Sequence, residues 1–245
     1  MRRLRNDSAS QNWVVSVTGL LEIRKQPLST LLADFLICKS CQVVDRDHER
    51  MRVGYACSNC GVPGDGARAY FPMSVVSLID LMQEFYHMKQ ESGSELGEDL
   101  NLDKKGNHRL AVVIFFCTLG EVLLEEFLTH VMMKLELPPS IQKRLLDDNM
   151  FVKQRIEKVF PALTGVQWKE TVHKLSKGKQ LNYSKTAEFY QTVIKKRNVF
   201  LHKGIKWAIP KEMPENCLRQ IWPIVNLFVA LHNEFITSSA AKRSY

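Results

Sequence analysis

Residues 195–204 read KKRNVFLHKG and bring together three side chains that can act on a phosphodiester: Arg197, Asn198 and His202. Breaking RNA without a metal ion requires a base for the ribose 2′-hydroxyl, an acid for the leaving 5′-oxygen and positive charge beside the developing phosphorane. A histidine titrates near neutral pH and can be base or acid, while an arginine offers a charged fork to the non-bridging oxygens. The pattern R-N-x-x-x-H therefore favours phosphodiester chemistry.

This pattern is short, so a structural explanation competes with the chemical one. From the 14 Arg, 11 Asn and 7 His in 245 residues, we expect the three residues at this spacing roughly 0.02 times by chance. A histidine followed by Lys203 and Gly204 can also cap carbonyl groups at a helix end and meet the negative end of the helix dipole. An arginine on such a helix is usually solvated, and this second interpretation involves no reaction.

The helix that must carry the pattern is predicted to run from an N-cap at Ser184 to about His202, with Gly204 as its C-terminal stop. Asn198 precedes His202 by four positions, so both project from one side and the amide can orient the imidazole. Arg197 precedes His202 by five positions, which places the two roughly 140° apart around the helix. One helix therefore does not direct both side chains at one phosphate.

Two C-x-x-C pairs, separated by fifteen residues, account for four of the six cysteines: Cys38, Cys41, Cys57 and Cys60. Two such turns can complete a tetrahedral all-sulfur shell around one ion. With short strand patterns around the pairs, residues 33–72 resemble a zinc ribbon. The resemblance implies a structural zinc ion, because a closed four-thiolate shell leaves no open coordination position. The alternative, two disulfides, is disfavoured in a cytosolic chain.

Behind the cysteines, apolar residues recur at helical spacing almost everywhere. We divide the chain into three parts. Residues 1–70 form an N-terminal segment with the zinc ribbon, and residues 108–245 form a helical domain. Residues 71–107, a helix and an acidic loop, form the linker between them. Helices are predicted over residues 72–90, 108–135, 140–147, 151–160, 166–175, 184–202 and 215–237. The expected fold class is mainly α, with a small β zinc-ribbon module in front.

An R-N-x-x-x-H helix inside a basic, all-helical domain resembles the HEPN superfamily, whose nuclease members carry an Arg-x4-6-His motif, often with Asn after the Arg. The resemblance covers residues 108–237, or 72–237 with the preceding helix, and only the motif helix is specific. It implies a HEPN-like helical bundle and a homodimer in which two motif helices build one composite site. Residues 118–125 (TLGEVLLE) are loosely similar to the first family helix, which implies that Glu121 supports the site.

Positive charge is concentrated around this motif. The net charge is +8, and residues 169–211 alone hold eleven Lys or Arg against two acidic residues. A concentrated basic surface favours polyanions such as nucleic acid, although a solvated lysine-rich face is the alternative. We predict that RNA contacts the lysines beside the motif, which are Lys195, Lys196, Lys203 and Lys206.

The remaining sequence patterns indicate where the protein acts and which enzyme classes lack their usual motif. The longest apolar run, residues 110–119, is about half of the roughly 20 residues that a membrane-spanning helix needs. No secretory signal is recognisable, so we expect the protein in the cytoplasm. P-loop, G-x-S-x-G and H-E-x-x-H patterns are absent from the sequence.

Our leading hypothesis from these patterns is a metal-independent endoribonuclease. The resemblance implies the role of a toxin or antiphage-defence effector, with an antitoxin or another defence-system protein as a possible partner. The alternative is a non-catalytic nucleic-acid-binding or scaffold protein with a structural zinc ribbon.

Overall fold

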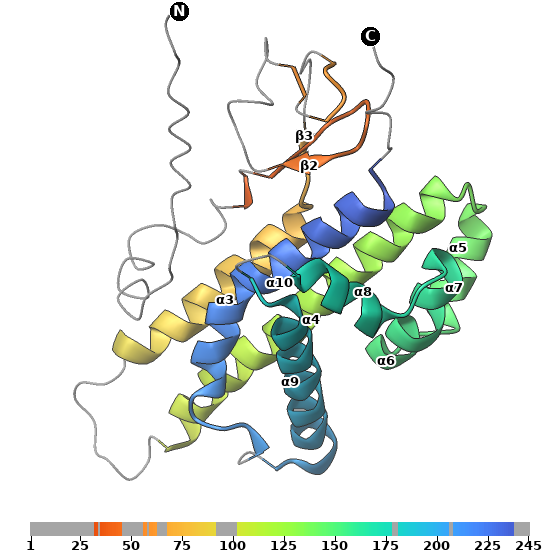
Figure 1. Cartoon of the computed structure of the whole chain (residues 1–245). Helices are drawn as coiled ribbons and strands as arrows, with labels where there is room; N and C mark the ends of the chain where they lie inside the picture. Colours follow the sequence, from red (N-terminus) through yellow and green to blue (C-terminus); the bar gives the residue numbers. More distant parts are fainter. Residues whose placement is uncertain are drawn as a thin grey trace, which may run out of the picture.

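The computed structural model describes residues 32–33, 35–45, 56–57, 59–62, 68–91, 102–177, 181–205 and 208–237. The chain is mainly helical, and a small three-stranded antiparallel sheet precedes the helices, which confirms the fold class at this level (Figure 1). The strands are β1 (Leu36–Ile37), β2 (Val44–Asp45) and β3 (Arg68–Ala69). The helical elements are α3 (Met73–Glu91), α4 (Leu102–Lys134), α5 (Pro139–Asp147), α6 (Val152–Gln154), the π-helix η2 (Arg155–Val159), α7 (Phe160–Thr164), α8 (Trp168–Ser176), α9 (Tyr183–Lys203) and α10 (Met213–Phe235).

The sheet has the strand order β2-β1-β3 and rests on the helices. Ile37 of β1 pairs with Val44 of β2 and with Arg68 of β3. Strands of two residues are too short to be stable alone. Ile37 and Val44 are buried with Phe35 in the same core as the helices, so this packing supplies the stability that the strands lack.

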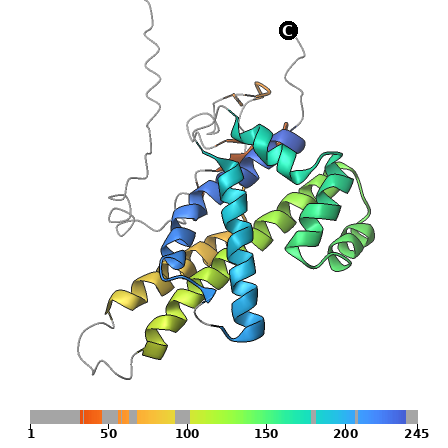
Figure 2. The same ribbon diagram turned by 60° about the horizontal axis from the view of Figure 1, so that its bottom comes forward.

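Helix α4 is the centre of the helical body. Phe116 and Leu119 in its middle are completely buried, and the helix packs against α3, α10 and α9. Figure 2 shows α9 crossing α4, so the two helices meet over a limited length. At this crossing Gly120 faces the ring of Tyr190, and the Tyr190 hydroxyl donates to the Cys117 carbonyl at 3.3 Å.

Helix α3 packs into this core, although it lies in residues 71–107, which we predicted to be a linker. Val75, Ile79 and Met82 are completely buried against α4 and α10. Helix α4 begins at Leu102, six residues before the predicted start at His108. The stretch LDKKGN (102–107) has no apolar period that would have indicated a helix. Residues 92–101 of the predicted loop lie outside the described residues.

The predicted single helix over residues 151–160 is instead α6, η2 and α7 in succession. The Phe160 N–H donates to the Arg155 carbonyl, five residues back, which widens the turn. Pro161 explains the wide turn, because proline has no N–H to donate and its ring collides with the carbonyl four residues earlier in an α-helix. Gly165, at φ 76°, then ends α7.

Helix α9 ends where the sequence predicted, but its N-terminal cap is a different residue. Asn182, not Ser184, is the N-cap, because its side-chain oxygen accepts a hydrogen bond from the Lys185 N–H at 3.1 Å. Both residue types are good N-caps, and sequence alone does not rank them. Gly204 ends the helix as predicted: it is left-handed, at φ 63°, and its N–H donates to the Phe200 carbonyl at 2.8 Å.

Among the described residues, no helix combines the length and the apolar character that crossing a bilayer would require.

Candidate metal centre and phosphodiester site

Two turns with the same hydrogen bonds carry the four cysteines. In the first turn the Cys38 N–H donates to the Val43 carbonyl at 2.9 Å, and the Gln42 N–H donates to the Cys38 carbonyl at 3.0 Å. The turn that starts at Cys57 repeats both bonds, at 2.9 and 2.8 Å. In each turn the residue after the second cysteine is left-handed, with φ 61° at Gln42 and 70° at Gly61. The C-x-x-C spacing therefore produces two equivalent halves of one site.

The four sulfur atoms come together as the spacing predicted. All lie within 4.8 Å of one another, and the Cys38–Cys60 and Cys41–Cys57 sulfur pairs are 3.9 and 3.7 Å apart. A tetrahedron with metal–sulfur bonds of about 2.3 Å has sulfur–sulfur edges of about 3.8 Å. The arrangement can therefore hold one metal ion with four thiolates.

The burial of the sulfurs couples metal binding to the loss of thiol protons. Cys41 and Cys57 are 1% and 4% exposed, and burial raises the pKa of the Cys57 thiol to about 12. Without an ion, this thiol is therefore neutral at neutral pH. A metal ion binds the thiolate form, so binding releases protons and weakens as the pH falls.

Helix α10 holds the first cysteine turn and strand β2 in place. The Asn233 side chain accepts from the Val44 N–H and donates to the Val44 carbonyl, both at 2.8 Å. The His232 Nε2 lies 2.9 Å from the Gln42 carbonyl, so this nitrogen carries the proton and donates. Burial lowers the pKa of His232 to about 4, which keeps the ring neutral at neutral pH. The metal centre is thus joined to the end of α10.

Replacing Asn233 with Ala should lower the free energy of unfolding by about 2 kcal/mol, because both backbone groups of buried Val44 lose their partner. Asn226→Ala is the matched control: Asn226 lies on α10 too, but among the described residues its amide donates only to the Trp222 carbonyl within that helix. Chemical denaturation measures both. Equal losses for the two variants would show that the bonds to β2 contribute nothing beyond an ordinary helix contact.

The residues of the candidate phosphodiester site lie on α9. Among them, Arg197 faces inward. Its Nη2 donates to Glu121 Oε1 of α4 at 2.8 Å, and the Arg197 side chain is 17% exposed. The Arg197 Nε has no hydrogen-bond partner among the described residues. The structure thus brings together Arg197 and Glu121, which are 76 positions apart in the sequence.

Asn198 and His202 lie on the outer side of α9. Both are exposed, and no hydrogen bond joins them in the part of the chain that is described. Arg197 is turned toward α4, so within one chain it and His202 point to different sides, as their spacing requires. The neighbouring lysines Lys195, Lys196 and Lys203 are exposed as well. Lys206 lies outside the described residues.

No protein-family model matches this chain, and no curated protein or solved structure shows a significant match to it.

A second ion pair beside the first escaped sequence analysis. Glu125, one helical turn after Glu121 on α4, accepts from Arg155 Nη1 at 2.9 Å, and the Arg155 Nε donates to the Asn149 carbonyl at 3.0 Å. The Arg155 side chain is only 12% exposed. Glu121 and Glu125, four apart within the largely apolar middle of α4, were the available signal. Neither arginine could be assigned to them by spacing, because both lie in other elements.

Proposed function

We propose that the protein is a metal-independent endoribonuclease of HEPN type, with its active site between two copies of the chain. The observation that carries the proposal is the end of α9. There a solvent-exposed histidine and asparagine lie close in sequence to an arginine that a carboxylate holds in a fixed position. This arrangement supplies a titratable group, an orienting amide and a positioned positive charge, which are the groups that metal-free RNA cleavage needs.

The inward position of Arg197 gives Glu121 its role in the proposal. The carboxylate fixes one end of the guanidinium through Nη2, while the remaining N–H groups can bind a non-bridging phosphate oxygen. A carboxylate at this place also limits the motion of the long arginine side chain, which lowers the entropy lost on substrate binding. Glu121 is therefore a positioning residue, and His202 is the proton-transfer residue.

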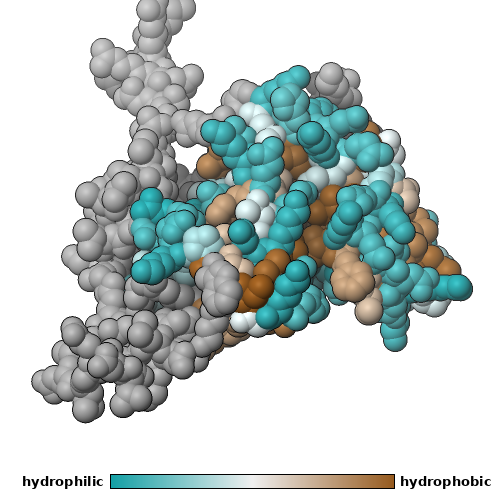
Figure 3. All heavy atoms as spheres, turned by 90° about the horizontal axis from the view of Figure 1, so that it is seen from below, coloured by the Kyte–Doolittle hydropathy of each residue, from teal (hydrophilic) through white to brown (hydrophobic). Residues whose placement is uncertain are grey.

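A homodimer resolves the divergent directions of Arg197 and His202. Two α9 ends that face each other can bring the histidine of one chain near the arginine of its partner. Leu201, directly before His202, is 52% exposed, and Figure 3 shows apolar surface between hydrophilic side chains on the side where α9 ends. Exposed apolar side chains beside the motif supply contact area for a second copy.

Zinc is the metal that we propose for the four-cysteine centre. Four thiolates in a closed tetrahedral arrangement suit zinc, and such a shell has no position for water or substrate. The ion would stabilise the fold and take no part in cleavage. We place the protein in the cytoplasm as a toxin or antiphage effector, restrained by a partner protein until RNA cleavage is required.

His202→Ala should lower the cleavage rate about a thousandfold, within the range that general acid–base catalysis contributes. The assay uses a fluorescent RNA with EDTA present, and the zinc content is measured afterwards to show that the structural ion is retained. Gln191→Ala is the matched control, because Gln191 is exposed on the same side of α9. It should cleave like the native protein. Products should end in a 2′,3′-cyclic phosphate.

Undiminished cleavage by the His202→Ala variant would remove His202 from the mechanism. RNA binding that weakens steeply with salt, without cleavage by the native protein, would instead favour the non-catalytic nucleic-acid-binding alternative.

A further inference from the structure

Helix α8 presents a row of basic side chains to solvent. Lys169 and His173 are four residues apart, and Lys177 follows four residues later, directly after the last turn. All three are exposed. Residues four apart on a helix lie on one side and about 6 Å apart along the axis, which is close to the spacing of phosphates in an extended single strand.

The opposite side of α8 fixes the orientation of this row. Trp168, Thr171 and Val172 are buried, at 7%, 4% and 2% exposed, and Trp168 packs against Phe160 and Phe228. Since this apolar side is anchored in the core, the helix cannot rotate the basic side chains away from solvent. The row is a fixed feature of the surface.

Few acidic side chains neutralise the positive charge of this row. Lys174, on the neighbouring strip of α8, is bound to Glu234 at 2.5 Å, and Glu170 is exposed beside it. None of the three residues of the row forms an ion pair with another described residue. The charges of Lys169 and Lys177 therefore remain available to an anionic ligand.

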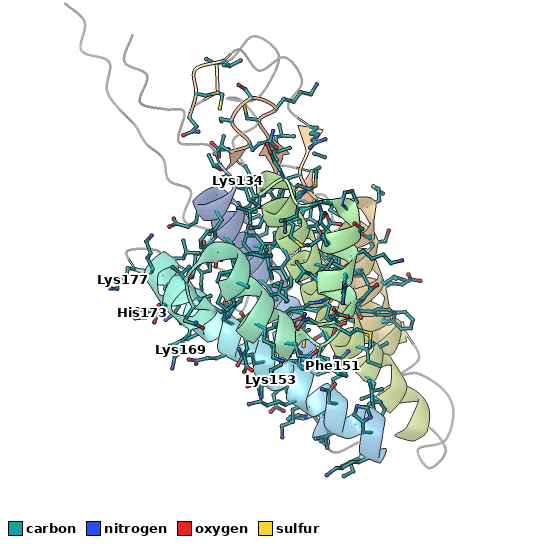
Figure 4. The ribbon with its side chains drawn as sticks, turned by 90° about the vertical axis from the view of Figure 1, so that its right-hand side faces the viewer. Lys134, Phe151, Lys153, Lys169, His173 and Lys177 are labelled. Atoms are coloured by element: carbon teal, nitrogen blue, oxygen red, sulfur yellow. The ribbon has the colours of Figure 1, made fainter. Side chains whose placement is uncertain are left out.

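Helix α6 continues the row and adds an aromatic ring. Lys153 is 80% exposed, and its only ion pair among the described residues is a contact of 3.9 Å with Glu157. An exposed pair of this kind contributes little energy. Phe151, two residues earlier, is 68% exposed. Figure 4 shows the labelled Lys177, His173, Lys169, Lys153 and Phe151 following one another across the side of the molecule that faces the viewer.

We propose that Lys169, His173, Lys177, Lys153 and Phe151, which we call the basic row, bind single-stranded RNA. The lysines contact successive phosphates, and Phe151 stacks on an unpaired base. A base inside a duplex is not accessible to such a ring, so the aromatic residue selects the single strand. This inference rests on the proposed function, because it supplies the strand that the α9 site would cut.

Binding is tested with a fluorescent 20-nucleotide RNA and with its duplex, on the full chain carrying His202→Ala so that cleavage does not interfere. Adding Lys169→Ala and Lys177→Ala should weaken single-strand binding at least about tenfold and reduce the slope of log affinity against log salt by about 1.4. Phe151→Ala should weaken it about tenfold with little change of slope. Lys143→Ala with Lys211→Ala removes the same charge from other exposed positions and is the control.

The basic row is overturned by equal losses in the control and the Lys169/Lys177 variant, or by tighter binding of duplex than of single strand. If the native protein cleaves in a His202-dependent manner while the row variants bind normally, the row fails and the ribonuclease stands. If no cleavage occurs but the row variants lose binding, the row stands and the ribonuclease fails. Circular dichroism and gel filtration show that each variant is folded.

Discussion

Replacing Cys57 with Ser is expected to abolish binding of the proposed zinc ion and to lower the melting temperature by at least about 10 °C. The strands of the cysteine module have two residues each, so they depend on packing against the helices and on the proposed ion together. Structural zinc ions bind zinc-finger peptides with about 10–16 kcal/mol of apparent free energy, and a zinc ion at these cysteines would stabilise the folded state in the same way.

The loss should extend beyond the cysteine turns. Phe35, Ile37 and Val44 belong to the helical core, and Val44 is held by Asn233. Unfolding of the module therefore removes the cover from the end of α10. Amide exchange near Asn233 should become faster in the Cys57→Ser variant, whereas the middle of α4 should remain protected.

Metal content by mass spectrometry and thermal unfolding by circular dichroism test this prediction together. Cys217→Ala is the control, because Cys217 is a buried thiol of α10 remote in sequence from the cysteine turns. It should retain one metal ion per chain. A Cys57→Ser protein with native melting temperature and native amide protection would contradict the prediction, because the module would then be stable without its ion.

Gly120→Ala should lower the free energy of unfolding by about 3 kcal/mol or more, at the upper end of the effects of overpacking a core. A β-carbon at this position would overlap the ring of Tyr190 and lie 2.6 Å from its hydroxyl oxygen. The ring cannot easily move, because it is 4% exposed and packs edge-on against Phe116. Helix α9 would have to shift away from α4.

This shift should also reach the α9 site. Glu121 follows Gly120 directly, and its bond to Arg197 spans the same two helices. We therefore expect the Gly120→Ala protein to lose RNA cleavage more than its remaining folded fraction explains.

The double variant Gly120→Ala with Tyr190→Leu provides the control for Gly120→Ala. Leucine lacks the ring atoms that a methyl group at position 120 would meet, so the double variant should be less destabilised than the sum of the single variants. Denaturant unfolding measures the three free energies. Additive losses would show that Gly120 is required for another reason than the approach of Tyr190.

The parts of the molecule that the sequence predicted well are local in the chain. The C-x-x-C spacing determined the cysteine turns, because each turn closes within a few residues. Gly204 marked the end of α9 for the same reason. Apolar periodicity located the long helices, because the apolar residues that each helix buries recur along one of its sides.

The parts that it missed depend on contacts between distant residues or on a single local exception. Asn233 and His232 resemble ordinary residues near a helix end, and their partners are 189 and 190 positions away. The pairing of Arg155 with Glu125 spans 30 positions. The π-helix depends on one residue, Pro161. The spacing of apolar residues does not show how this proline widens the preceding turn.

The two cysteine turns differ in how freely their sequences can change. The first adopts a left-handed backbone at Gln42, a conformation that costs a non-glycine residue about 1–2 kcal/mol, and the carbonyl of this residue accepts a hydrogen bond from the Nε2–H of His232. The second adopts the same backbone at Gly61 without that cost, and no hydrogen bond joins it to a helix among the described residues. A glycine at position 42 would therefore relieve the backbone cost of the first turn and keep the carbonyl that bonds to His232, whereas any other residue at position 61 would introduce that cost into the second turn.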